Sequence, residues 1–330
     1  MRRSVVRGSG SYLPDRVMTN FDLEKIVETS DEWIRQRSGI SERRIAGDEL
    51  STSMMAIEAA KNALAHGNLQ PDDIDGIVVA TSTPDHTFPS VATMVQAALD
   101  IPFCPAFDIQ AVCTGFVYAL SIADNLVTSG GANRVLVIGA EKMSSILNWE
   151  DRTTCVLFGD GAGAIVIQAQ DTEDDPKSKS ARGVLSSHLY ANGKLKDILH
   201  VNGGPSTTGL AGHIVMEGKE VFRHAVQLMS SVVAEALEQN DLSADEIDWL
   251  VPHQANIRII DAMQKKMQLP SEKVIRTVAA HANTSAASIP LALATAVGDG
   301  RVQNGDLLAM EAIGGGLVWG AALVKFGRPS

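Results

Sequence analysis

The sequence predicts a duplicated α/β fold, in which two related halves each pack helices against a sheet of short, buried strands. The decapeptides at 69–78 and 242–251 share the pattern L-x-x-D-[DE]-I-D-x-[IL]-V, and each lies between a helical periodicity and an apolar segment. The chain has 330 residues, whereas a single core stops growing near ~250–300 residues. A common helix-to-strand connector could explain the decapeptide alone. However, three features recur in the same order in both halves: the decapeptide after an amphipathic helix, a small-residue helix that leads into a buried strand, and a final strand.

The predicted elements repeat along the chain. In the helix expected at 220–239, apolar residues recur every three or four positions, as in an amphipathic helix. The apolar run at 135–138 is typical of a strand covered by helices on both faces. The first half is expected to contain helices at 54–66 and 114–128 and strands at 77–80, 135–139 and 161–168. The second half is expected to contain helices at 220–239 and 285–297 and strands at 249–252, 307–312 and 319–326. We place the boundary in the polar stretch 171–180, giving domains 1–172 and 173–330.

Composition excludes several classes of protein. The apolar fraction of 45% and charged fraction of 20% argue against disorder. With 39 acidic and 28 basic residues, the net charge of −11 disfavours binding to nucleic acid. No apolar run approaches the ~18–20 residues of a membrane span, and the basic N-terminus continues into Gly-Ser-Gly rather than a signal peptide. We therefore expect a cytoplasmic protein without a membrane partner.

Three cysteines leave one candidate nucleophile. Cys104, Cys113 and Cys155 form neither an even-numbered disulfide framework nor a zinc-binding pattern, which fits a reducing compartment and no metal site. Cys113 stands between an extended segment and a helix, with small neighbours at Ala111 and Gly115. The helix dipole favours a thiolate there and can lower the pKa below the free value of ~8.5. A buried structural thiol is the alternative.

His253 and Asn283 occupy related places in the second half. His253 follows the strand expected at 249–252, and functional groups collect at strand ends in open α/β sheets. Asn283 precedes the helix that corresponds to the one after Cys113, so it should approach that cysteine from the other half. A structural histidine and a helix-capping asparagine remain alternatives.

Glycine-rich and basic segments complete the candidates. The stretch 158–164 leads into a strand, whereas a dinucleotide fingerprint opens a helix, so we predict a tight β-turn. The glycines at 314–316 permit a ligand to approach the backbone, whose N–H groups could stabilise an oxyanion. Trp33 stands beside the first four of a set of basic residues that either bind an adenine nucleotide or form a solvated face. These basic residues are Arg35, Arg37, Arg43, Arg44, Arg152, Arg258, Lys265 and Lys266.

Six motifs together resemble one family over essentially the whole chain. They are T-S-D-E-W-I at 29–34, V-C-T-G at 112–115, F-G-D-G-A-G at 158–163, V-P-H-Q-A-N-I-R at 251–258, H-A-N-T-S-A-A-S at 281–288 and G-G-G at 314–316. The sequence resembles β-ketoacyl-acyl-carrier-protein synthase III, the initiating condensing enzymes of type II fatty-acid synthesis in the thiolase-like superfamily. Ala282 departs from the glycine usual in that family. The resemblance implies a thiolase-like duplicated fold of two pseudo-twofold related halves in five layers (αβαβα).

The resemblance also implies a reaction and its residues. The activity would be that of an acyltransferase: decarboxylative Claisen condensation of a short acyl-CoA, with acetyl-CoA as the expected primer, and malonyl-acyl-carrier protein (ACP), by a ping-pong route through acyl-Cys113. No cofactor or metal is implied, and the partners would be the carrier protein and a second copy of the chain. The implied catalytic residues are Cys113, His253 and Asn283, with oxyanion donors at the N–H groups of Cys113 and Gly315. The implied coenzyme A contacts are Thr29, Trp33, Arg37, Arg152, Asn256 and Arg258. The implied carrier-protein contacts are Gln254, Ala255, Asn256, Ile257 and Arg258. The implied acyl pocket contains Phe158, Met216 and Phe88, the last reaching across a dimer interface to the partner's pocket.

Other functions remain open at this point. A specialised ketosynthase or acyltransferase of secondary metabolism would keep Cys113, and a non-catalytic scaffold of the same fold would not need the three polar residues. A papain-like hydrolase also uses Cys, His and Asn, but in a secretory context and another architecture.

Overall fold

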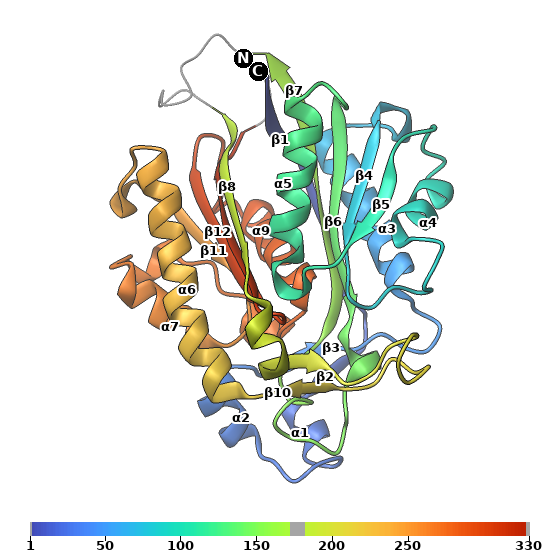
Figure 1. Cartoon of the computed structure of the whole chain (residues 1–330), viewed down its shortest axis with the longest axis vertical. Coiled ribbons are helices and arrows are strands. Elements are labelled where there is room, and N and C mark those ends of the chain that lie inside the picture. The colour runs from blue at the N-terminus through green and yellow to red at the C-terminus, as the bar shows by residue number, and fades with distance from the viewer. Residues whose placement is uncertain (1, 172–181, 328–330) are drawn as a thin grey trace.

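Two mixed β-sheets form the frame of the computed structural model, which describes residues 2–171 and 182–327 (Figure 1). The first sheet has the order β1-β7-β6-β4-β5 and the second has the order β11-β12-β13-β8. The strands of the first sheet are β1 (Arg2–Tyr12), β4 (Gly76–Ala80), β5 (Ala106–Ile109), β6 (Arg134–Lys142) and β7 (Asp160–Asp171). Those of the second are β8 (Gly183–Ala191), β11 (Trp249–Pro252), β12 (Leu307–Gly314) and β13 (Val318–Lys325).

The strand pairing repeats between the sheets, which confirms the duplicated α/β fold. In the first sheet β4 is parallel to β5 and β6, while β6–β7 and β7–β1 are antiparallel. In the second sheet β11–β12 is parallel, and β12–β13 and β13–β8 are antiparallel. A single parallel bridge between Leu250 and Val274 stands where β5 stands in the first sheet. The expected domain boundary at 172/173 lies outside the described residues, so the division into two domains stays a prediction.

Helices fill three layers around the two sheets, giving the expected αβαβα order (Figure 1). Helices α3 and α4 cover the outer face of the first sheet, α5 and α9 lie between the sheets, and α6 and α7 cover the outer face of the second. Their bounds are α3 (Thr52–Gly67), α4 (Val91–Ala98), α5 (Gly115–Thr128), α6 (Gly218–Gln239), α7 (Ile257–Lys266) and α9 (Ser288–Gly298). None of the helices in residues 2–171 and 182–327 is both long and apolar enough to cross a bilayer.

Smaller elements gather at one end of the molecule, at the bottom of Figure 1. Helix α2 packs against α7 there, so a segment from early in the chain lies on the second half. These elements are α1 (Asn20–Leu23), α2 (Asp31–Ser38), the hairpin β2 (Val17–Thr19) and β3 (Glu42–Arg44), the pair β9 (Leu199–Val201) and β10 (Ile214–Met216), and α8 (Val278–His281).

Glycines in the strands allow the layers to approach closely. A Cβ on Gly163 in β7 would lie 2.6 Å from the backbone N of Leu291 in α9, and one on Gly139 in β6 would lie 2.2 Å from the carbonyl oxygen of Ala286. The tight turn predicted at 158–164 is therefore wrong, because most of that stretch belongs to β7 and its glycines serve helix packing. In the second half, the strands predicted at 307–312 and 319–326 form a hairpin, with three residues joining β12 to β13.

Candidate active site

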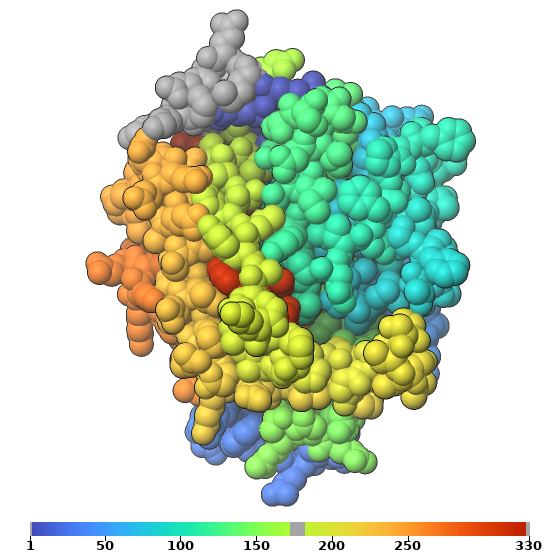
Figure 2. All heavy atoms as spheres, viewed as in Figure 1, coloured from blue at the N-terminus to red at the C-terminus, as the bar shows by residue number. Residues whose placement is uncertain are grey.

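A cavity of about 1410 Å³ opens where the two halves meet. Cys113 from the first half lines it together with His253 and Asn283 from the second, as does Gly315. The three residues predicted as a catalytic set thus share one cavity. The segment at 199–216, which supplies several lining residues, crosses the lower part of the face in Figure 2 as a yellow band.

Cys113 lies on a strained turn between β5 and α5. It occupies the 3₁₀ turn Val112–Thr114, and Val112 has φ of +48°, a conformation that a β-branched residue rarely adopts. A Cβ on Gly314 would lie 2.8 Å from the backbone N of Cys113. The first glycine of the 314–316 run is therefore required for β12 to reach the cysteine.

Burial favours the protonated form of the Cys113 thiol. Burial raises the pKa of Cys113 to about 12, while a hydrogen bond with Ser285 lowers it and the nearby Glu141 raises it. A helix dipole stabilises a charge by at most about 2 kcal/mol, whereas desolvating a buried ion costs several kcal/mol. Burial therefore opposes the thiolate that the sequence predicts at the helix N-terminus.

Two polar residues next to Cys113, Ser285 and Glu141, have roles that the sequence did not predict. Ser285 Oγ donates to Glu141 Oε1 at 3.1 Å, and Glu141 also accepts from Thr83 Oγ1 at 2.6 Å. Because Ser285 also bonds the Cys113 thiol, it lies between the cysteine and the buried carboxyl group. Glu141 is near the end of β6, and the strand-end argument used for His253 would have identified it.

His253 is buried and neutral. Its backbone N–H donates to the carbonyl of Glu311 at 2.8 Å, and its Nδ1 lies 2.6 Å from Ser288 Oγ at the start of α9. Burial lowers the pKa of His253 to about 3. The imidazole that lines the cavity is therefore expected to be uncharged at neutral pH.

Asn283 is fixed against the first half by its backbone. Its N–H donates to the carbonyl of Leu157 and its carbonyl accepts from the N–H of Gly159, both at 3.0 Å. Its Oδ1 accepts from the N–H of Ser285 at 2.9 Å. This leaves the amide Nδ2 as the donor that Asn283 can present to a ligand in the cavity.

Aromatic and basic residues surround the mouth of the cavity. The guanidinium carbons of Arg37 and Arg152 lie 5.8 and 5.3 Å from the Trp33 ring centroid, within the range of cation–π attraction. Trp33, Arg37, Asn256 and Arg258 line the cavity. Arg152 contacts the ring of Trp33, which lines the cavity. Its Nη1 also donates to the carbonyl of Glu28 at 3.0 Å, next to Thr29.

The segment expected to contact a carrier protein is only partly available. Gln254 is fully buried, and its side chain bonds backbone groups of Pro252, Ile275, Thr277 and Val278. The Gln254 side chain therefore has no free surface with which to contact a carrier protein, contrary to the expectation. Ile257 packs near Gly39, where an added Cβ would lie 2.6 Å from the Ile257 side chain.

Asn256 has a structural role besides lining the cavity. Its Oδ1 accepts from the N–H of Arg258 at 2.8 Å, which caps α7, and its Nδ2 donates to the carbonyl of Arg37 at 3.0 Å. Ala255 is partly buried and lines the cavity, while Arg258 is exposed at its mouth.

The expected acyl-pocket residues separate into two places. Phe158 and Met216 line the cavity. Phe88 is 83% exposed and lies on the surface of this chain, so its reach into a partner's pocket stays a prediction. Among the described residues, no group of three His, Cys, Asp or Glu side chains could hold a metal ion.

Comparison with known proteins identifies a single family. Two family models match: 3-oxoacyl-[acyl-carrier-protein (ACP)] synthase III at residues 107–193 and its C-terminal counterpart at residues 237–326. A β-ketoacyl-[acyl-carrier-protein] synthase III of Rhodospirillum centenum is 57% identical over 98% of this chain and 99% of its own length.

Solved structures give the same picture. The 3-oxoacyl-[acyl-carrier-protein] synthase III of Aquifex aeolicus superposes with a TM-score of 0.91 at 49% identity, covering 98% of this chain and 100% of that one. The priming β-ketosynthase of the R1128 polyketide pathway superposes with a TM-score of 0.92 at 34% identity, covering 100% and 98%.

The pH dependence of Cys113 alkylation tests whether the thiol is protonated in the free protein. We expect its alkylation by iodoacetamide to accelerate about tenfold per pH unit from pH ~6.5 to ~9, because only the thiolate reacts. Peptide-resolved mass spectrometry separates Cys113 from Cys104 and Cys155, with Cys113→Ser as the control. A rate that levels off below pH ~8 would show a thiolate in the free protein and contradict the expectation.

Ala282 stores backbone strain that a glycine would relieve. It has φ of +56° and ψ of −159°, a region populated essentially by glycine. Ala287, also fully buried, has an ordinary φ of −76°. Both Ala→Gly changes lose one buried methyl group and gain chain entropy on unfolding, so their difference reports the strain.

We expect Ala282→Gly to be more stable than Ala287→Gly by roughly 1–3 kcal/mol. Chemical denaturation of the two variants measures this difference. Equal stabilities would show that the turn before Asn283 carries no strain.

Proposed function

Because the chain belongs to the 3-oxoacyl-[acyl-carrier-protein] synthase III family, we propose that it condenses a short acyl-CoA primer, acetyl-CoA by preference, with malonyl-ACP. The chain is a condensing enzyme of fatty-acid synthesis with an acyltransferase-type activity. The observation that supports the proposed reaction is the meeting of Cys113, His253 and Asn283 in one buried cavity.

In the first half-reaction the Cys113 sulfur attacks the thioester carbon of acyl-CoA. The N–H groups of Cys113 and Gly315 are the proposed donors to the tetrahedral oxyanion. The carbon–sulfur bond to coenzyme A then breaks, and the thiol proton leaves with the coenzyme A sulfur. Burial raises the pKa of the thiol and lowers that of His253, so we propose that the proton moves during this exchange rather than before it.

In the second half-reaction malonyl-ACP loses CO2, and the electrons of the broken carbon–carbon bond pass to the thioester oxygen. His253 and Asn283 are the proposed hydrogen-bond donors to that enolate. Each such donor is worth about 2.7–4 kcal/mol in the transition state. The enolate carbon attacks the acyl-cysteine, Cys113 leaves as thiolate and takes a proton from solvent, and 3-oxoacyl-ACP is released.

Ser288 supports the donor role of His253. Its Oγ lies 3.3 Å from the N–H of Gln254, which donates to it, and 2.6 Å from His253 Nδ1. We propose that the Ser288 hydroxyl donates its proton to Nδ1, which places the imidazole proton on Nε2. A neutral Nε2–H donor suits an enolate oxygen.

The remaining expectations follow from the same reaction. Loss of CO2 makes the carbon–carbon step irreversible, so we propose that the enzyme needs no metal or organic cofactor. Trp33, Arg37 and Arg152 are the proposed coenzyme A contacts, and Arg258 is the proposed carrier-protein contact at the mouth. We further propose a cytoplasmic homodimer in which Phe88 contacts the partner's acyl pocket; its 83% exposure supports this contact.

A role in priming a specialised pathway is the second candidate. The R1128 priming β-ketosynthase shares 34% identity and the fold over the whole chain. Both candidates use an acyl-cysteine, so primer choice separates them.

Substitutions at Cys113 and Asn283 separate the half-reactions. We expect Cys113→Ala to form no acetyl adduct with acetyl-CoA yet to retain decarboxylation of malonyl-ACP. Asn283→Asp keeps the oxygen that accepts from Ser285 and removes the amide donor; it should form the adduct but slow condensation about 10²–10³-fold. Intact-protein mass spectrometry and CO2 release measure the two steps. An acetyl adduct on Cys113→Ala would refute the nucleophile.

Primer preference tests the proposed substrate. With acetyl-, propionyl-, isobutyryl- and octanoyl-CoA in competition, we expect acetyl-CoA to give the highest kcat/KM with malonyl-ACP as acceptor. A preference for octanoyl-CoA, or for malonyl-CoA over malonyl-ACP as acceptor, would favour the specialised pathway.

A further inference from the structure

Arg43 is a fully buried cation that the proposed reaction does not use. It is 0% exposed, and burial lowers its pKa to about 10. Its Nη1 donates to the carbonyl of Met18 at 3.2 Å and to Asn20 Oδ1 at 2.8 Å, and its Nη2 donates to the carbonyl of Val156 at 2.8 Å. All of these acceptors are neutral. Since burying a guanidinium costs several kcal/mol, its position calls for an explanation other than stability.

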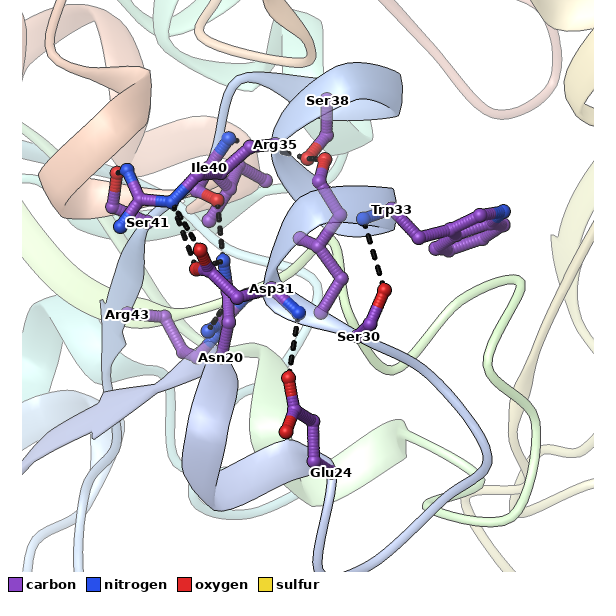
Figure 3. Close-up of polar contacts among 11 residues, drawn as sticks. Asn20, Glu24, Ser30, Asp31, Trp33, Arg35, Ser38, Ile40, Ser41 and Arg43 are labelled. Carbon is purple, nitrogen blue, oxygen red and sulfur yellow. Dashed lines mark hydrogen bonds and ion pairs between the residues drawn. The ribbon is translucent and has the colours of Figure 1, made fainter.

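Asn20 links this cation to both ends of helix α2. Its Nδ2 donates to Asp31 Oδ1, in the first residue of the helix, and to the carbonyl of Ile40, just beyond the last, each at 2.8 Å (Figure 3). Asp31 is fixed in turn by Arg35 Nε at 2.8 Å, and its N–H donates to Glu24 Oε1 at 2.7 Å.

The other end of the network reaches the segment that carries Arg152. Val156, whose carbonyl accepts from Arg43, follows Arg152 by four positions in a turn closed by the bond from the N–H of Cys155 to the carbonyl of Asp151 at 3.0 Å. Arg152 crosses to the α2 side, where its guanidinium carbon lies 5.3 Å from the Trp33 ring centroid. In Figure 3 the Trp33 ring points away from Asn20 and Arg43.

We propose that Asn20, Arg43 and Asp31 are positioning residues that fix α2 relative to segment 151–156, and so hold Trp33 and Arg152 ready for the nucleotide of acyl-CoA. The inference rests on the proposed function, in which Trp33 and Arg152 contact coenzyme A. A pair that is already ordered loses little conformational entropy when the ligand binds. The network therefore tunes the affinity for acyl-CoA and leaves malonyl-ACP unaffected, because the carrier protein presents its phosphopantetheine without adenine.

Asn20→Asp tests the link with little change in volume. The new carboxylate still accepts from Arg43, but it cannot donate to the Ile40 carbonyl and it repels Asp31. We expect the KM for acetyl-CoA to rise roughly five- to fifty-fold, as ordering Trp33 and Arg152 becomes a cost of binding. The kcat, the KM for malonyl-ACP and the kcat/KM for S-acetylpantetheine, which lacks the nucleotide, should stay unchanged.

Two further variants complete the design. Asp31→Ala removes the carboxylate at the partly exposed start of α2 and should reproduce the KM effect if Asn20→Asp does not fold. Gln36→Ala removes an exposed side chain of the same helix, whose Nε2 donates to Glu32 Oε1 at 2.9 Å, and should change neither KM. In a Trp33→Ala background, Asn20→Asp should raise the KM for acetyl-CoA by a smaller factor than it does in the unsubstituted chain.

The outcomes distinguish the inference from its premise. A rise in the KM for acetyl-CoA that disappears with S-acetylpantetheine supports the positioning role. Equal losses with both substrates, or no loss in either variant, would overturn it while leaving the proposed reaction intact. If Trp33→Ala itself leaves the KM for acetyl-CoA unchanged, the proposed coenzyme A contact is wrong, and the inference falls with it.

Discussion

Close packing of the turn at residues 285–287 against the first sheet is the constraint on which the site depends. A Cβ on Gly139 would lie 2.2 Å from the carbonyl oxygen of Ala286, and one on Gly115 would lie 3.2 Å from the Ala286 Cβ. Only glycine in β6 permits this approach. This close packing places Ser285 between Cys113 and Glu141, and it brings Asn283 into contact with the backbone at 157–159. The duplication thus becomes functional through contact between the halves.

The same packing makes the reactive groups neutral. Cys113 and His253 are almost completely buried, and burial moves the pKa of the thiol up and that of the imidazole down. In such surroundings a hydrogen bond to a developing charge is stronger than in water, while a standing charge is costly. A neutral thiol and a neutral donor therefore suit a reaction whose charges form and disappear on the substrate's thioester oxygen.

The sequence predicted those features that depend on the order of elements along the chain. It did not predict those that depend on how a residue is packed in the folded protein. The internal repeat predicted the duplicated fold, and the repeat's symmetry placed His253 and Asn283 opposite Cys113. Local sequence does not reveal how deeply a side chain is buried: burial opposes the thiolate predicted at Cys113 and removes the Gln254 side chain from the surface. The β-turn at 158–164 was wrong for a related reason: its glycines serve a helix more than 120 positions away.

The two ends of the cavity are organised by different forces. Around Cys113, the geometry is set by backbone contacts at glycines, where a side chain would not fit. Gly314 and Gly139 are the clearest cases. Around Trp33, buried side-chain hydrogen bonds from Asn20 and Arg43 set it. Under the proposed function, both half-reactions use the Cys113 end, whereas only acyl-CoA brings a nucleotide to the Trp33 end. Changes in the side-chain network can therefore alter the affinity for the primer without altering the chemistry at the cysteine.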